Sequence, residues 1–269
     1  MRIARGEALR AMRTPDGPAT LSVRSVGERI DAEAWGPGAR WSLEHAPGMV
    51  GAEDDDAGFR PRHAAVADAW RRHRGVRITR STGVVHALIP AILEQKVTGV
   101  EARRAYRLMA KTLGEPAPGS FGLLLPPDPE RVAGLPYFSF HPWGVERRRA
   151  ELIRAVCERA GRIEAAALSS TPQLTRLLGA FRGIGPWTVA EVARLALGDA
   201  DAVSVGDFHL PHLVSWAIAG EPRGTDERML ELLEPYAGQR GRAQRLLEAS
   251  GIRAPAYGPK APVRSIASL

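Results

Sequence analysis

The spacing of apolar residues changes along this sequence, and that change limits the possible folds more than any other feature. Residues 20–24 and 30–34 alternate apolar with polar side chains, which is typical of strands that bury one face. A Gly-Pro-Gly sequence at residues 36–38 predicts a turn, after which Trp41 and Leu43 are expected to resume a strand. The first part of the chain is therefore predicted to be an antiparallel β-sheet.

The pattern becomes helical after an acidic stretch that is flanked by glycine and proline at residues 51–62. Val85, Leu88, Ile89 and Ile92 are spaced as one face of a helix, which predicts a mostly buried helix over residues 84–96. Further helices are expected to begin near Val145 and to cover residues 172–180, 186–197, 208–219 and 226–235. The predicted class is α+β and mostly α, with a sheet domain at 1–62, a helical domain at 63–250 and an irregular tail at 251–269.

A capping-box pattern marks the start of another helix. Thr98 has the form of an N-cap and Glu101 is placed to bond back to it. The polar run just before it, Glu94-Gln95-Lys96, is therefore expected to form an exposed corner between two helices.

The charge balance favours a polyanionic partner. Lys and Arg number 37 against 30 Asp and Glu, a formal charge of +7. Binding a polyanion releases condensed counterions, although a generally basic, Arg-rich proteome explains the same excess.

The single cysteine, Cys157, excludes thiolate metal clusters and is expected to be a small buried residue. Without a long apolar run or an export signal in the sequence, a cytoplasmic location is expected.

The sequence RGIGPWT at residues 182–188 predicts a tight turn between two helices. Pro186 suits the first position of the second helix, and the glycines permit close approach of a phosphate to backbone N–H groups. A Gly-Ile-Gly turn is weak evidence by itself, because any tight helix–helix connection can use one. A second run, SVGDFHL, follows at residues 204–210 and places Asp207 a fixed distance downstream.

Taken together, LLGAFRGIGPWTVAEVARLAL and DAVSVGDFHL resemble the helix-hairpin-helix DNA glycosylases, and most closely the DNA-3-methyladenine glycosylase II branch. The resemblance extends to AILEQKVTGVEARRA and to the N-terminal sheet. It implies that Asp207 is the catalytic carboxylate, which stabilises positive charge on the sugar and orients or deprotonates water. The alternative is that Asp207 only caps the helix that follows it.

The resemblance also implies an enzyme that leaves the DNA strand uncut. Relatives that cut the strand carry a nucleophilic lysine in the hairpin region, and Trp187 stands at the corresponding position. Trp187 is a candidate to stack on a flipped, cationic base, with ordinary helix packing as the alternative. Phe208, Tyr137 and Trp143 are further candidates for the base pocket, although most aromatic residues near Tyr137 are expected to pack in the core.

Two regions are candidates for DNA contact. One is the hairpin, through Gly183, Gly185 and Thr188. The other is the corner formed by Gln95, Lys96 and Val97, where the resemblance places the residues that fill the gap left by the flipped base; a solvated lysine is the alternative for Lys96. Groups of arginines are weaker candidates for phosphate contacts, because charged runs are usually solvated: Arg71, Arg72 and Arg74; Arg147 to Arg149; and Arg240, Arg242 and Arg245.

The function expected from these features is base-excision repair of an alkylated or deaminated purine in double-stranded DNA, by a monomer without cofactor, metal or membrane partner. His141 and His209 lack metal-ligand spacing and are expected to be structural. Two alternatives stay open. One is a DNA-binding protein without catalysis, and the other is a glycosylase for oxidised or mismatched bases.

Overall fold

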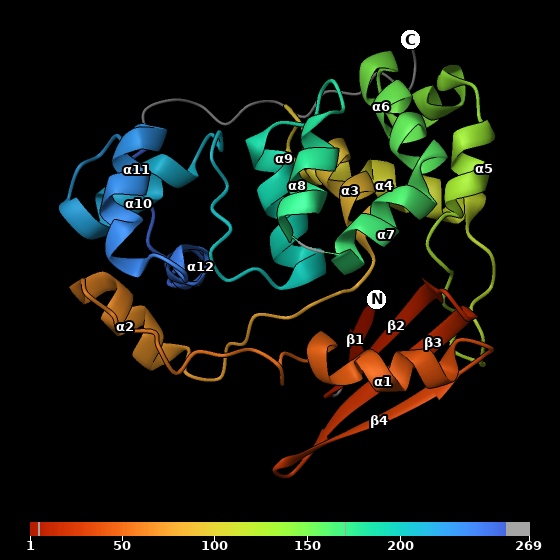
Figure 1. The fold of residues 1–269 in the computed structure, drawn as a ribbon, viewed down its shortest axis with the longest axis horizontal. Coiled ribbons are helices and arrows are strands. Elements are labelled where there is room, and N and C mark those ends of the chain that lie inside the picture. Colours follow the sequence, from red (N-terminus) through yellow and green to blue (C-terminus); the bar gives the residue numbers. More distant parts are fainter. Residues whose placement is uncertain (5, 170, 257–269) are drawn as a thin grey trace. The chain divides into compact units, whose positions relative to one another are not determined.

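The computed structural model describes residues 1–4, 6–169 and 171–256, and shows a small sheet with many helices (Figure 1). The predicted α+β, mostly helical class is confirmed. The chain divides into two compact units. The first comprises Met1–Val50 and Thr82–Ala165, and the second comprises Gly51–Ser81 and the described part of Ala166–Ala261. In the tail predicted at 251–269, residues 257–269 lie outside the described part. No described helix is long and apolar enough to span a bilayer.

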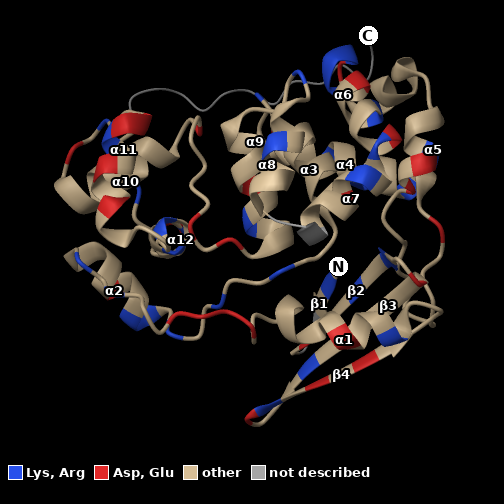
Figure 2. Ribbon diagram, in the orientation of Figure 1, with Lys and Arg blue, Asp and Glu red and all other residues tan. Residues whose placement is uncertain are grey.

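The sheet of the first unit is antiparallel, as predicted, with its strands in chain order. Its members are β1 (Arg2–Ala4), β2 (Glu7–Thr14), β3 (Gly17–Val26) and β4 (Arg29–Trp35). Both signs of charge follow each other along β4 (Figure 2), where Asp31 and Glu33 alternate with apolar residues. This alternation is typical of a strand with one face in solvent.

The strand predicted after the Gly-Pro-Gly turn is wrong, because Trp41 and Leu43 lie in helix α1 (Ala39–Met49). Trp41 stacks on His45 one turn later, with ring centroids 3.9 Å apart. The buried positions of the helix, Ser42, Ala46 and Gly48, are all small, so the helix packs closely on the sheet. The alternation from Trp41 to Leu43 spans only three residues, which is too few to distinguish a helix from a strand.

The second face of β3 is also covered. Thr20 and Ser22, which the alternation predicts on a polar face, are both buried. The Thr20 hydroxyl donates to the Pro118 carbonyl at 2.7 Å, and the Ser22 hydroxyl donates to Glu7 Oε1 at 2.7 Å. Each buried hydroxyl is therefore satisfied by a partner that is distant in the sequence.

Helix α3 (Val84–Glu94) is almost wholly buried, as predicted, and both of its ends are held by side chains of later helices. Glu164 accepts the N–H groups of Val84 and Val85, and Arg149 donates to the Leu93 carbonyl at 2.7 Å. These contacts satisfy backbone groups that a helix leaves unpaired at its ends. The neighbouring elements are α4 (Gly99–Leu113), α5 (Pro129–Gly134), the 3₁₀ helix η1 (Tyr137–Trp143), α6 (Arg147–Glu158) and α7 (Ala160–Ser169).

The second unit packs α10, α11 and α12 with α2 around one apolar core (Figure 1). Phe59, Met229 and Tyr236 are among its buried members. The predicted helices near 172–180, 186–197, 208–219 and 226–235 are confirmed, whereas α2 and α12 were not predicted. The elements are α2 (Ala64–Arg72), α8 (Thr171–Gly179), α9 (Pro186–Val192), the π-helical turn η2 (Ala193–Leu197), α10 (Leu210–Ala219), α11 (Asp226–Leu233), the 3₁₀ turn η3 (Glu234–Tyr236) and α12 (Arg240–Ala249).

Candidate active site

The hairpin joins α8 to α9 within the second unit. Gly183 has φ of +107°, a conformation that favours glycine, so the chain reverses there without strain. Ile184 is 7% exposed, and its N–H donates to the Phe181 carbonyl at 3.0 Å. Gly185 is the N-cap of α9 and Pro186 is its first residue. The buried side chain of Ile184 thus anchors the turn, while Gly183 and Gly185 leave the backbone of the turn uncovered by side chains.

Asp207 receives three hydrogen bonds, and they come from two different helices. Its Oδ1 accepts the N–H groups of His209 at 2.7 Å and Leu210 at 2.9 Å, at the start of α10. Its Oδ2 accepts the indole N–H of Trp187, the second residue of α9, at 3.1 Å. The alternative that Asp207 caps a helix is therefore confirmed for one oxygen, while the other bonds to the hairpin side.

The loop that carries Asp207 is fixed by residues that the sequence analysis did not single out. Gly206 has φ of +91°, and its N–H donates to both carboxylate oxygens of Asp226 at 3.1 Å. Ser204 is buried, donates to Glu191 of α9 at 2.5 Å, and its N–H bonds to Gln244 of α12. Gly206 carried a detectable signal, a glycine directly before the aspartate. The partners Asp226, Glu191 and Gln244 carried none.

An exposed aromatic ring follows the carboxylate. Phe208 is 80% exposed and meets His209 edge-on, with centroids 4.9 Å apart. A single exposed apolar side chain is common on protein surfaces, so the exposure of Phe208 by itself assigns it no ligand. Trp187 and Asp207 are each partly buried.

The other candidates for the base pocket, Tyr137 and Trp143, belong to the first unit. Trp143 is 7% exposed and packs edge-on against Phe140, with centroids 5.2 Å apart. The Arg147 guanidinium lies over the ring of Tyr137, and its Cζ atom is 4.7 Å from the centroid of that ring. The structure brings Trp187, Asp207 and Phe208 together in the second unit, and the assignment of Tyr137 and Trp143 to a base pocket stays a prediction.

The corner predicted at Gln95, Lys96 and Val97 joins α3 to α4. Lys96 is exposed and has φ of +56°, a conformation that is uncommon for a residue with a side chain. The capping box is confirmed, since Thr98 accepts the Glu101 N–H and Glu101 accepts the Thr98 N–H at 2.8 Å. Helix α4 is thus fixed at its first turn, directly beside the strained corner.

The hairpin residues predicted to contact DNA differ in accessibility. Gly185 is exposed and Gly183 is partly exposed, whereas Thr188 is 2% exposed. A hollow of about 490 Å³ lies on the α8 and α9 side of the hairpin, and neither Asp207 nor Trp187 lines it. Among the described residues, no group of three or more His, Cys, Asp or Glu side chains could hold a metal ion.

No protein-family model and no curated protein sequence matches this chain, so the comparisons rest on solved structures. A 3-methyladenine DNA glycosylase from Archaeoglobus fulgidus matches with a TM-score of 0.77 at 19% identity, covering 92% of this chain and 88% of its own. An 8-oxoguanine glycosylase/lyase from Clostridium acetobutylicum, in complex with double-stranded DNA, matches with a TM-score of 0.68 at 14% identity. That match covers 89% of this chain and 86% of the other.

A third similar structure is the 3-methyladenine DNA glycosylase of Schizosaccharomyces pombe in complex with abasic DNA. Its TM-score is 0.59 at 18% identity, and the match covers 75% of this chain and 97% of that one. These enzymes act on different bases, so the likeness extends across glycosylases of more than one specificity. The chain has the fold of the helix-hairpin-helix DNA glycosylases.

Proposed function

We propose that this protein is a DNA glycosylase that hydrolyses the N-glycosidic bond of an alkylated or deaminated purine in double-stranded DNA. The observation that carries the proposal is the Asp207 carboxylate. It is held from two helices, beside the hairpin and next to the exposed ring of Phe208. A side chain that served only as a cap would not need the second anchor on α9.

The proposed reaction uses the carboxylate as a fixed negative charge. As the bond between the base and C1′ breaks, its electron pair leaves with the base, and positive charge develops on the sugar. A fixed carboxylate stabilises that charge without reorganisation, which is the main source of electrostatic catalysis. Water then bonds to C1′, and its proton passes to Asp207 or to solvent.

Trp187 supports hydrolysis without strand cutting. Its indole has no nucleophilic amine and cannot form a Schiff base with the sugar. An electron-rich ring attracts a cationic base, and alkylation makes a purine cationic. Trp187 and Phe208 are therefore the proposed stacking surfaces. Gly183 and Gly185 in the hairpin and Gln95, Lys96 and Val97 at the corner are the proposed DNA contacts. Thr188 is buried, so it is not among them.

The test is a panel of duplexes that each carry one lesion, incubated with wild-type protein and with Asp207→Asn. Wild type should release free base, and strand breaks should appear only after alkali treatment. Asp207→Asn should bind the same duplexes but release base at least about a hundredfold more slowly, because it removes the negative charge. Asp31→Asn, on β4, is the matched control and should keep wild-type activity.

Each contrary outcome selects an alternative. Duplex binding without base release from any lesion would favour a DNA-binding protein without catalysis. Strand breaks before alkali treatment would show lyase chemistry and contradict the role proposed for Trp187. Full activity of Asp207→Asn would remove Asp207 from the reaction.

A further inference from the structure

We propose that Trp187 is a positioning residue that sets the orientation of the Asp207 carboxylate through its indole N–H. This inference rests on the proposed function, in which Asp207 is the reacting group. It assigns Trp187 a polar role that is separate from stacking on a base. The direct observation is the 3.1 Å hydrogen bond from Nε1 to Oδ2.

The bonds at Asp207 leave little freedom for a further partner. An ionised carboxylate has about four acceptor positions. Two at Oδ1 are used by the N–H groups of His209 and Leu210, and one at Oδ2 is used by Trp187. About one position therefore remains, and it is on Oδ2. That oxygen is the one that can face C1′ or accept a bond from the attacking water.

The indole bond supplies an anchor that α10 cannot supply. The N–H groups of His209 and Leu210 hold Oδ1, but they leave Oδ2 free to swing as the carboxylate rotates. Trp187 lies on α9, directly after the hairpin, so its bond to Oδ2 ties the carboxylate to a second element. The loop backbone lies alongside, since a Cβ added at Gly206 would be 3.9 Å from Trp187 Cβ.

The donor is also neutral, and this suits the reaction. A lysine ammonium in the same place would offset much of the carboxylate charge, whereas an indole N–H donates a hydrogen bond and carries no net charge. The carboxylate is therefore oriented while it keeps its negative charge for the developing positive charge on the sugar.

Kinetics with three variants tests the inference. Trp187→Phe keeps an aromatic ring but loses the donor, and we expect kcat to fall about tenfold with KM little changed, since one neutral hydrogen bond is removed. Trp187→His should recover part of kcat, because imidazole places Nε2–H where the five-membered ring of indole places Nε1–H. Trp216→Phe, a partly exposed tryptophan on α10, should behave as wild type.

A readout that needs no activity accompanies the kinetics. The Trp187 indole resonance, assigned by its disappearance in Trp187→Phe, should exchange with solvent about tenfold faster in Asp207→Ala. Unchanged exchange, or a Trp187→Phe defect confined to KM, would overturn the positioning role. A wild-type protein that releases no base from any duplex would instead overturn the proposed function. Thermal unfolding of every variant separates these outcomes from loss of the fold.

Discussion

His86 lies in α3 with its Nδ1 atom buried and without a hydrogen-bond partner in the described part of the chain. Burial is the main cause that lowers its pKa to about 4, and the nearby charges of Arg13 and Arg10 add to the effect, with Asp128 opposing it. Cys157 shows the opposite response, because burial, with smaller effects from Asp128 and Glu158, raises the pKa of its thiol to about 12. In each case burial disfavours the charged form.

The lowered pKa of His86 predicts that the protein becomes less stable as the pH falls. The unfolded chain binds a proton near pH 6.5, whereas the folded chain does not bind it until about pH 4. The unfolded state therefore holds more protons between these values, and the free energy of unfolding falls as pH falls, by up to about 3 kcal/mol. Urea unfolding at pH 7 and pH 4.5 measures this loss.

A matched pair of variants isolates the contribution of His86. His86→Leu should flatten the pH dependence of the free energy of unfolding between pH 6.5 and pH 4. His73→Leu, at a partly exposed histidine at the end of α2, is the matched control. Equal slopes in wild type and His86→Leu would contradict the assignment.

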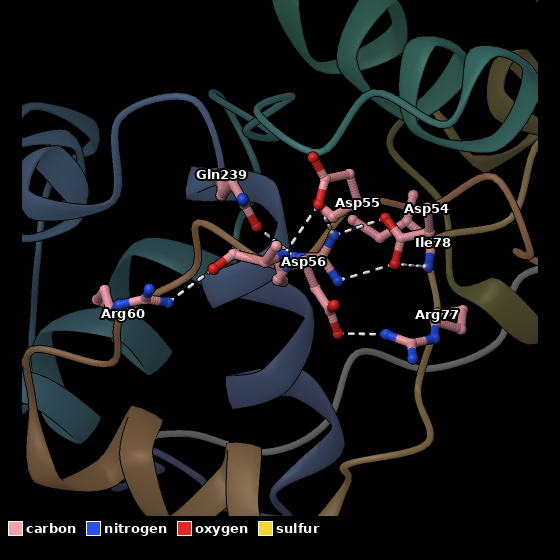
Figure 3. Close-up of polar contacts among 9 residues, drawn as sticks. Asp54, Asp55, Asp56, Arg60, Arg77, Ile78 and Gln239 are labelled. Atoms are coloured by element: carbon pink, nitrogen blue, oxygen red, sulfur yellow. Dashed lines mark hydrogen bonds and ion pairs between the residues drawn. The ribbon is translucent and has the colours of Figure 1, made fainter.

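At the scale of elements, the acidic segment before α2 is fixed by α12. Arg242 donates to both carboxylate oxygens of Asp54, and the two side chains are 3% and 5% exposed. Figure 3 shows Asp54 with the Ile78 N–H that it accepts. Burial alone would raise the pKa of the Asp54 carboxyl, but its bonds to Arg242 and to the Ile78 N–H hold that pKa below its usual value. The neighbouring Asp56 pairs with Arg77 nearer the surface.

Asp54→Ala should therefore destabilise the protein strongly. It leaves the Arg242 charge buried and uncompensated, at an expected cost of about 3–5 kcal/mol. Asp56→Ala is the matched control and should cost no more than about 1 kcal/mol, because its ion pair is partly exposed. The double variant Asp54→Ala with Arg242→Met should recover much of the stability. Chemical unfolding measures all three, and equal effects of the two single variants would contradict the difference in burial.

These element contacts also explain a limit of the sequence interpretation. Arg149 and Arg242 belong to arginine groups considered for phosphate contacts, yet both are buried and bonded within their own unit. Arg240 pairs with Asp201. Sequence spacing identifies arginines as a group, but it does not show which of them meets a carboxylate from a distant segment.

At the scale of the whole molecule, the positive excess is not evenly neutralised. Many surface arginines have a carboxylate partner, as Arg40 has Glu44. By contrast, Arg103, Arg104, Arg107 and Lys111 are exposed along α4, and within the described chain none of them lies within ion-pair distance of a carboxylate. A helix face with four cations in nine residues suits a phosphate backbone.

We expect this face to contribute to duplex binding through charge alone. Replacing all four residues by Gln should weaken binding regardless of sequence, and should reduce the slope of log affinity against log salt by about 0.9 for each phosphate that the protein no longer neutralises. Titrations of an undamaged duplex at several salt concentrations measure the slope. Arg40→Gln is the control, and an unchanged slope in the fourfold variant would exclude the α4 face from the interface.

The sequence by itself determined the features that depend on near neighbours. Apolar periods identified the sheet and the buried helix α3, and the Thr98–Glu101 pattern identified a cap, because residues within about four positions meet in any helix. The hairpin turn was also recognisable, because its glycines and proline are neighbours in the sequence. Asp207 became a candidate through the resemblance to the helix-hairpin-helix glycosylases. The strand predicted from the alternation at residues 41–43 was wrong, because three residues fit both the strand period of two and the helix period of 3.6.

Only the tertiary structure decided how distant side chains meet. The bond from Trp187 to Asp207, the two caps of α3 and the burial of Thr20 each join segments whose separation in the sequence carries no periodic signal. Such contacts depend on how whole elements pack, and packing follows from burial of the complete apolar surface. The sequence therefore located the candidate carboxylate, whereas the fold determined which of its oxygens accepts backbone N–H groups and which accepts the indole N–H.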